Sequence, residues 1–234
     1  MNILISGSSR GIGRAIAEYF ALKGFNIMIC SRDESKLEEA KTRLINLNNS
    51  VNVLTFQCDL SKKNEVEDLV DFIKVQWKEV NVFVNNAGKY LEKELFEESD
   101  DEFENLLKVN LHSAYFLTKK ILPLIPENRK SHIFNMASVA GIEAKKNCGA
   151  YSISKFALVG FSKVLREHLK LKGIRVTTLI PGAVMTDSWK GIDIVKERIM
   201  EAEDIAANIY NIYTLSEKTV VEEIVYRPFL GDIE

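Results

Sequence analysis

The sequence has few of the residues that build metal sites, disulfide frameworks or membrane spans. Only three cysteines and three histidines occur among 234 residues, and no two cysteines have CxxC spacing. We therefore expect no metal site, and thiols kept reduced rather than paired as disulfides. No apolar run approaches the roughly 20 residues of a membrane-spanning helix, and the opening apolar run, residues 1–5, is too short for a signal peptide.

The charges nearly cancel, with 31 Lys and Arg against 33 Asp and Glu, a formal net charge of -2. This balance provides no general attraction to nucleic acid or to an anionic membrane, so we expect neither as a partner. The reduced thiols and the absence of a signal peptide predict a cytoplasmic location. Hydrophobic residues make up 46% of the chain, which is enough for one core. With no Pro/Gly/Ser-rich linker and no repeat, the sequence predicts a single domain over residues 1–234.

Short β-branched runs alternate with amphipathic stretches along the chain, a pattern typical of repeated βα units and a parallel sheet. Residues 27–29 and 82–84 are continuously apolar, as strands buried on both faces are. The sequence predicts strands at 2–6, 26–31, 51–57, 80–85, 132–137, 174–180 and 219–226. It predicts helices at 12–23, 34–47, 62–78, 100–122 (as two helices meeting near Asn110) and 150–172.

A glycine-rich turn, SGSSRGIG at residues 6–13, joins the first strand to the first helix. Glycines at such a turn permit positive φ and a close approach of the backbone to a phosphate. The helix N-terminus adds free N–H groups and a partial positive charge. The spacing is GxxxGxG rather than the usual GxGxxG, but its position after the first strand predicts a dinucleotide site.

The same residues also spell GxSxG, the nucleophile elbow of a hydrolase, with Ser9 as the nucleophile. Only five residues precede Ser6, so no earlier strand exists to contribute an oxyanion loop. His112, His132 and His168 offer no obvious catalytic base. The sequence therefore disfavours a hydrolase.

Four further residues indicate acid–base chemistry on a carbonyl group. Tyr151 and Lys155 are four apart near the start of the last long predicted helix, so the phenol and the ammonium share one face. A nearby cation stabilises phenolate and lowers the phenol pKa from about 10. Ser138 follows the fifth strand, at the edge of the expected ligand crevice, where its hydroxyl can donate to a substrate oxygen. Asn110, at a helix junction, can serve a water relay. Taken singly, each of these four residues also fits a purely structural role.

Together these motifs resemble the classical short-chain dehydrogenase/reductases over nearly the whole chain. The resemblance implies a catalytic tetrad of Asn110, Ser138, Tyr151 and Lys155. In it Tyr151 is the general acid in reduction, Lys155 tunes Tyr151 and bonds the nicotinamide ribose, Ser138 orients the substrate oxygen, and Asn110 completes a proton relay. It also implies an α/β fold, a single Rossmann-type doubly wound domain with a seven-stranded parallel sheet of order 3-2-1-4-5-6-7 and helices on both faces.

The resemblance also implies where the cofactor lies. Asp59, after the third strand, contacts adenine; the NNAG motif at residues 85–88 follows the fourth strand; and Thr186 bonds the nicotinamide carboxamide. The predicted cofactor contacts are Gly7, Ser9, Arg10, Gly11, Ile12, Gly13, Ser31, Arg32, Asp59, Leu60, Asn86, Ala87, Gly88, Tyr151, Lys155, Pro181, Gly182 and Thr186.

The end of the second strand bears on the choice of cofactor. NAD enzymes usually place an acid there to bond the ribose hydroxyls, and here that position is Ser31. Arg32 and Arg10 can bracket a 2′-phosphate. The alternatives are that both arginines are surface charges and that Asp33 reaches the ribose. The sequence predicts NADP(H), with NAD(H) less favoured.

The predicted function is hydride transfer between NADP(H) and a carbonyl or secondary alcohol of a small substrate, such as a 3-oxoacyl thioester or a ketone. The tail, residues 227–232, differs from that of acyl-carrier-protein reductases. Lys145 and Lys146 could attract an acidic substrate or carrier. We favour the alternative that they lie at an exposed loop tip. Predicted substrate contacts are Val139, Ile142, Cys148, Val184, Met185 and Trp189.

Two other functions compete with this one. A non-catalytic nucleotide-sensing Rossmann protein would need the glycine turn but not the Tyr–Lys pair. A sugar-nucleotide epimerase or dehydratase would generally carry a larger C-terminal region. Because members of the resembled family usually form dimers or tetramers, the resemblance implies a homotetramer or homodimer through helices at 110–122 and 150–172. Leu158, Phe161 and Leu165 could serve either the core or that interface.

Overall fold

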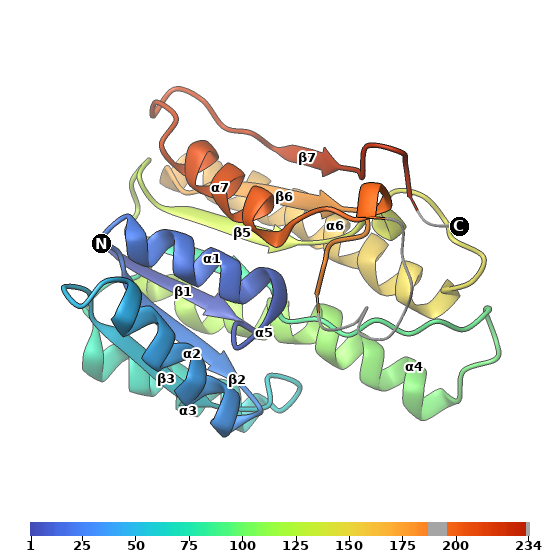
Figure 1. Cartoon of the computed structure of the whole chain (residues 1–234), viewed down its shortest axis with the longest axis horizontal. Helices are drawn as coiled ribbons and strands as arrows, with labels where there is room; N and C mark the ends of the chain where they lie inside the picture. The colour runs from blue at the N-terminus through green and yellow to red at the C-terminus, as the bar shows by residue number, and fades with distance from the viewer. Residues whose placement is uncertain (187–195, 233–234) are drawn as a thin grey trace.

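The structure, a computed structural model, describes residues 1–186 and 196–232. Seven parallel strands form one sheet in the order β3-β2-β1-β4-β5-β6-β7, which confirms the predicted topology (Figure 1). The strands are β1 Asn2–Ser6, β2 Asn26–Ser31, β3 Val53–Gln57, β4 Val82–Asn85, β5 His132–Met136, β6 Arg175–Pro181 and β7 Glu223–Tyr226. The strand order reverses between β1 and β4, and a ligand crevice opens at such a point in this class of fold.

Helices cover both faces of the sheet (Figure 1). They are α1 Gly11–Leu22, α2 Glu34–Leu47, α3 Lys63–Gln76, α4 Asp100–Leu107, α5 Ser113–Ile121, α6 Gly149–Leu169 and α7 Ala202–Tyr213. One apolar core joins α1, α2 and α7 to the sheet, and a second joins α3, α5 and α6 to the opposite face. Within the described residues, no helix is long and apolar enough to cross a membrane.

The buried strands are mostly apolar on both sides because each face of the sheet packs against helices. In β1, Ile3 and Ile5 enter the core beneath α1, while Leu4 points into the core on the other side. The expected strand starts at residues 51, 80 and 219 are wrong by two to four residues, since β3, β4 and β7 begin at Val53, Val82 and Glu223.

The predicted break near Asn110 is a π-helical turn. Lys108–His112 forms this turn between α4 and α5, and Asn110 is completely buried within it. A capping box starts α4, with the Ser99 hydroxyl accepting from the Glu102 N–H. Single π turns inside helices commonly mark functional sites, because the extra residue redirects a side chain.

A row of polar side chains crosses the buried sheet and fixes its register. Asn85, Asn135 and Thr178 are paired neighbours on β4, β5 and β6. Asn85 Nδ2 donates to Asn135 Oδ1 (2.8 Å), and Asn135 Nδ2 donates to Ser162 Oγ on α6 (3.0 Å). Thr178 Oγ1 also donates to Ser162 Oγ (2.7 Å). A shift of one residue in any of these strands would turn its polar group into the apolar core opposite.

Asn135→Ala should therefore destabilise the protein by about 2–4 kcal/mol, because it leaves a cavity and buried groups without partners. The free energy of unfolding from urea titration measures the effect. The matched control is Asn46→Ala at an exposed position of α2, expected to change stability by no more than about 0.5 kcal/mol. Equal effects of the two substitutions would contradict the role of the polar row.

Candidate active site

A cleft of about 510 Å³ opens at the carboxyl ends of the central strands. Its walls come from the segments that follow β4, β5 and β6, from the first turns of α6, and from Asp232 near the end of the chain. This is the edge of a parallel sheet where ligands bind in this fold class. Of the predicted site residues, the lining includes Ile12, Asn86, Gly88, Ser138, Tyr151, Lys155, Pro181, Gly182 and Thr186.

The glycine turn packs closely against its protein neighbours. Gly7 and Gly11 have positive φ values of 62° and 56°. A Cβ placed on Gly7 would lie 2.7 Å from Ala87 Cα, and one on Gly13 would lie 2.5 Å from Asn86 Nδ2. Two of the three predicted phosphate-binding glycines are thus required for the turn to pack against the NNAG segment.

Hydrogen bonds hold the NNAG segment against this turn. The Ser6 hydroxyl accepts from the backbone N–H groups of Asn86 and Ala87, both at 3.0 Å. Asn86 Nδ2 donates to the carbonyls of Ser6 (3.0 Å) and Gly7 (2.9 Å). Ser6, at the end of β1, and Asn86, directly after the adjacent β4, therefore fix the geometry of the turn.

Lys155 is buried at the base of the cleft. Its Nζ donates to the carbonyl of Met136 at the end of β5 (2.9 Å) and lies 5.7 Å from the centre of the Tyr151 ring. In the described part of the chain, no carboxylate forms an ion pair with it. Burial lowers the pKa of Lys155 to about 8, so the ammonium still predominates at neutral pH.

Tyr151 lies beside Lys155 and retains its proton at neutral pH. Burial raises the pKa of Tyr151 to about 12, although a hydrogen bond with Ser138 opposes the rise. The expected fall below 10 is thus not produced by the side chains alone. The Tyr90 ring packs edge-on against Tyr151, with 5.0 Å between ring centres. In this state the phenol keeps its proton and lies between Ser138 and Tyr90.

Asn110 lies behind the cleft and ties the loop after β4 to α6. Its Oδ1 accepts from Lys89 N–H (2.7 Å), and its Nδ2 donates to the Lys89 carbonyl (3.0 Å) and to Ser154 Oγ (2.9 Å). A Cβ on Gly88 would be 3.5 Å from both Asn110 Oδ1 and Lys155 Nζ, so the two side chains flank one small space. The structure explains the position of Asn110 through these contacts, and its part in a proton relay stays a prediction.

The end of β2 carries the residues that bear on cofactor choice. Ser9 Oγ donates to Ser31 Oγ (3.0 Å), and this hydrogen bond holds the glycine turn against the end of β2. The Asp33 carboxylate accepts from Lys36 N–H (3.1 Å) and pairs with Lys36 Nζ (3.2 Å), so it caps α2. Arg32 is exposed beside them.

Asp59 and Leu60 follow β3 along the same edge. Asp59 Oδ1 accepts from the backbone N–H (3.0 Å) and the hydroxyl (2.8 Å) of Ser61. Burial works to raise the pKa of Asp59, but the Ser61 hydrogen bonds and the charge of Arg32 outweigh it and hold the pKa below its usual value. Leu60 packs against the core under α3. A contact of either residue with adenine stays a prediction.

The predicted substrate contacts are only partly reproduced. Val139, Cys148 and Val184 line the cleft, whereas Ile142 and Met185 are exposed outside the lining, and Trp189 lies outside the described residues. The sequence predictions missed Tyr90 and Asp232, which also line the cleft. Tyr90 could have been found from its place two residues after the NNAG motif; Asp232 has no comparable local signal.

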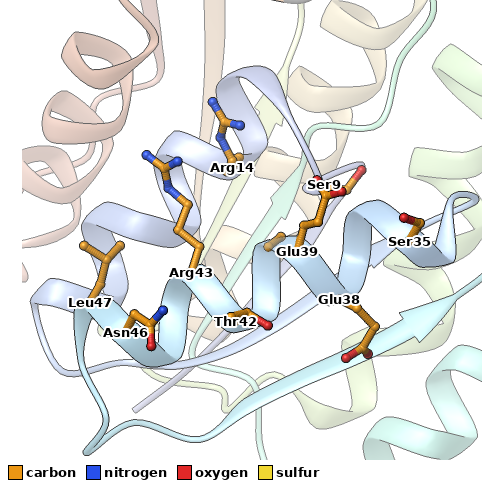
Figure 2. Close-up of a pocket in the computed structure, with 10 residues that line it drawn as sticks. Ser9, Arg14, Ser35, Glu38, Glu39, Thr42, Arg43, Asn46 and Leu47 are labelled. Carbon is orange, nitrogen blue, oxygen red and sulfur yellow. The ribbon is translucent and has the colours of Figure 1, made fainter.

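A larger hollow, of about 880 Å³, lies between α1 and α2 and holds no residue of the proposed tetrad (Figure 2). It touches the predicted cofactor site only at Ser9. No histidine in residues 1–186 and 196–232 lines either hollow, and the Ser9 hydroxyl is bonded to Ser31. This arrangement lacks the serine–histidine contact of a hydrolase, so we assign the chemistry to the smaller cleft.

Burial of the Lys155 ammonium predicts a pH-dependent effect of Lys155→Met on stability. The pKa falls from the usual 10.5 to about 8, which disfavours folding by about 3 kcal/mol below pH 8. The substitution removes this cost and loses one hydrogen bond of about 1 kcal/mol, so the variant should be more stable than wild type by about 2 kcal/mol at pH 7.

The folded state releases the lysine proton as pH rises from about 8 to 10.5, so wild type gains stability over that window. Urea titrations should show the advantage of Lys155→Met shrinking by about 2 kcal/mol between pH 7 and about pH 9.5. Lys218→Met, at an exposed position, is the control and should show no such trend. A wild type that is more stable than Lys155→Met at pH 7 would contradict the assignment.

Comparison with known proteins agrees with this geometry. A family model described as short chain dehydrogenase matches residues 1–195. Sepiapterin reductase from Chlorobaculum tepidum is 31% identical over 240 residues, covering 99% of this chain and 98% of that protein. An uncharacterized oxidoreductase from Staphylococcus saprophyticus is 32% identical over 226 residues, covering 96% of each.

Among solved structures, an alcohol dehydrogenase from the archaeon Thermococcus sibiricus, complexed with 5-hydroxy-NADP, superposes with a TM-score of 0.90 at 26% identity. The match covers 100% of this chain and 98% of that one. A metagenomic short-chain oxidoreductase in complex with NADP has a TM-score of 0.85 at 26% identity, covering 99% and 98%. Fold, cleft and relatives agree, and the chain belongs to the short chain dehydrogenase family.

Proposed function

We propose that residues 1–234 form one catalytic domain that transfers a hydride between NADP(H) and a carbonyl or secondary alcohol of a small substrate. The observation that carries the proposal is the convergence of Tyr151, Lys155 and Ser138 in one cleft beside the glycine turn. A protein that only sensed the nucleotide would have no need of a buried lysine next to a phenol that lines the cleft. The cytoplasmic location expected from the sequence remains part of this proposal.

Each side chain then has a definite task in reduction. NADPH, when bound, supplies the hydride that attacks the carbonyl carbon. The Tyr151 hydroxyl donates its proton to the carbonyl oxygen, and Ser138 donates a hydrogen bond to the same oxygen. The Lys155 ammonium stabilises the phenolate left on Tyr151, which then recovers a proton from solvent. In oxidation the same steps run in reverse.

The residues at the end of β2 fit a 2′-phosphate. Asp33 is engaged by the N-terminus of α2 and by Lys36, so its carboxylate is held away from a ribose diol. Ser31 carries no charge, and the exposed Arg32 provides a guanidinium suited to a phosphate. The relatives from Thermococcus sibiricus and the metagenomic source, solved with NADP-type cofactors, support the same choice.

We also propose a homotetramer or homodimer built through α5 and α6. Apolar side chains remain exposed on these helices, among them Val164, which is 70% exposed, and Tyr115, Ile153 and Phe156. Leu158 and Leu165 are buried in the chain itself and so do not belong to that surface. The half-buried Phe161 packs edge-on against Tyr115, with 5.8 Å between ring centres.

Tyr151→Phe should remove the proton donor while keeping the ring that packs on Tyr90. We expect kcat for carbonyl reduction to fall by about 10²-fold or more, with the Kd for NADPH, followed by its fluorescence, changed less than about threefold. Tyr19→Phe removes a hydroxyl on α1 and is the control. A Tyr151→Phe variant that keeps more than a tenth of the wild-type kcat would refute the proposed acid.

Arg32→Asp should reduce the preference for NADPH over NADH in kcat/KM by about tenfold or more, because a charge-assisted phosphate contact is replaced by repulsion. Lys218→Asp makes the same change of charge in the exposed segment after α7 and should leave the preference unaltered. A wild type that uses NADH as well as NADPH would overturn the cofactor assignment.

A further inference from the structure

Among the described residues, two carboxylates line the cleft, and the proposed reaction uses neither: Glu92, which is exposed, and Asp232, which is largely buried. Asp232 lies in the tail, residues 227–232, and its side chain lines the cleft although only 12% of it is exposed. It borders Gly182, where a Cβ would lie 2.3 Å from Asp232 Oδ1, so only glycine leaves room for the carboxylate there.

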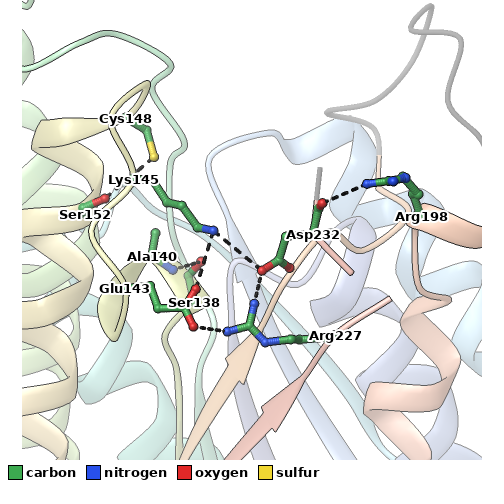
Figure 3. Close-up of polar contacts among 9 residues, drawn as sticks. All are labelled: Ser138, Ala140, Glu143, Lys145, Cys148, Ser152, Arg198, Arg227 and Asp232. Atoms are coloured by element: carbon green, nitrogen blue, oxygen red, sulfur yellow. Dashed lines mark hydrogen bonds and ion pairs between the residues drawn. The ribbon is translucent and has the colours of Figure 1, made fainter. Parts of the chain in front are cut away.

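An ionic cluster holds this carboxylate in place (Figure 3). Asp232 Oδ2 pairs with Arg227 and, at 3.7 Å, with Lys145. Glu143 pairs with the same two cations, at 3.6 Å from Lys145 Nζ. Arg198 donates to the Asp232 carbonyl (3.2 Å). The tail is thus fixed to the loop before α6 by two cations and two carboxylates whose charges cancel.

The two oxygens of Asp232 have different surroundings. Oδ2 is engaged by the cations, whereas Oδ1 is buried and has no hydrogen-bond partner among the described residues. A buried acceptor without a donor costs free energy until a donor is supplied. Asp232 and Gly182, against which Oδ1 packs, both line the substrate cleft. Oδ1 has almost no accessible surface of its own, so a ligand supplies the missing donor by displacing the groups that cover this oxygen.

We propose that Asp232 determines substrate specificity by accepting, at Oδ1, a hydrogen bond from an uncharged O–H or N–H group remote from the reacting carbonyl. This inference rests on the proposed function. Because Lys145 and Arg227 already neutralise the carboxylate, an ammonium group gains little there. An alkyl group would leave Oδ1 unpaired. The favoured substrates are polar carbonyl compounds with a hydroxyl, amide or ring N–H.

The cluster also bears on an acidic substrate. Lys145 and Lys146 are the two lysines that could attract an acidic substrate. Lys145 already forms ion pairs with Asp232 and Glu143. Lys146 is exposed and pairs with Glu94 at 3.3 Å, as expected of a loop tip. Neither lysine offers a buried, unengaged positive charge to a carboxylate or a phosphate on the substrate.

Four cyclohexanones test the proposal. They differ only in the substituent at carbon 4, which is a hydroxy, acetamido, methyl or ammonium group. Their Kd values are measured by calorimetry in the presence of NADP⁺, so that no ketone is reduced, and kcat/KM is measured separately with NADPH. We expect the hydroxy or acetamido compound to bind about tenfold or more tightly than the methyl and ammonium compounds, the effect of one hydrogen bond to a carboxylate.

Asp232→Asn should abolish that preference. Its amide oxygen takes the place beside the cations, which leaves the NH₂ group, a donor, where Oδ1 was. The ratio of methyl to hydroxy Kd should then fall about tenfold. Glu143→Gln is the matched control: it weakens the same cluster from a residue outside the cleft lining and should keep the wild-type ratio.

The inference is overturned if the methyl or the ammonium compound binds wild type most tightly, if no donor-bearing ketone binds, or if Asp232→Asn retains the wild-type ratio. Failure of the proposed function would give a different experimental result. If the Kd ratios behave as expected but no ketone is reduced with NADPH, the role of Asp232 stands and hydride transfer does not. If all four ketones are reduced with NADPH and bind with equal Kd values, hydride transfer stands and the role of Asp232 does not.

Discussion

The buried ammonium of Lys155 is the constraint on which the site depends. Its hydrogen bond to the Met136 carbonyl joins α6 to the end of β5 and so places Tyr151 over the cleft. A Cβ on Gly141 would lie 2.8 Å from the Lys155 carbonyl, so this approach of helix and loop requires a glycine. A charge held this way, with no acidic partner in the described residues, lowers stability. The proposed function gives this cost a purpose, since the reaction we propose uses the ammonium beside Tyr151.

Burial disfavours the charged forms of both the phenol and the lysine in this state. Burial raises the pKa of Tyr151 and lowers that of Lys155, so each group is pushed toward its neutral form. Anionic phosphates and ribose hydroxyls of a bound dinucleotide would favour the charged lysine, and a cationic nicotinamide would favour phenolate. In the proposed reaction the cofactor would therefore tune the acid–base pair as well as supply the hydride.

Much of the fold could be predicted because its signals are local. Continuous apolar runs such as β2 identify strands buried on both faces, and the glycine turn marks the first crossover. Nothing predicted corresponds to α7, although Ile205, Ile209 and Ile212 have helical spacing and pack in the core. This spacing is the signal by which the sequence encodes the helix.

The site was harder to predict where it depends on the path of the chain. The tetrad follows from motifs, but Asp232 enters the cleft only because the tail after β7 returns across Gly182 to the loop before α6. The direction of the Tyr151 pKa is set by burial, which no spacing of residues reveals. Likewise, Gly7 and Gly13 accommodate Ala87 and Asn86, contacts that exist only once β1 and β4 are neighbours.

The ionisation of Tyr151 with and without cofactor tests the central claim most directly. Ultraviolet difference titration of wild type against Tyr151→Phe isolates this phenol from the other tyrosines. The account predicts a pKa of about 12 in the free protein and a value lower by about two units or more when NADP⁺ is bound. A phenol that titrates at the same pH in both states would show that no coupled Tyr–Lys–nicotinamide site exists in this cleft.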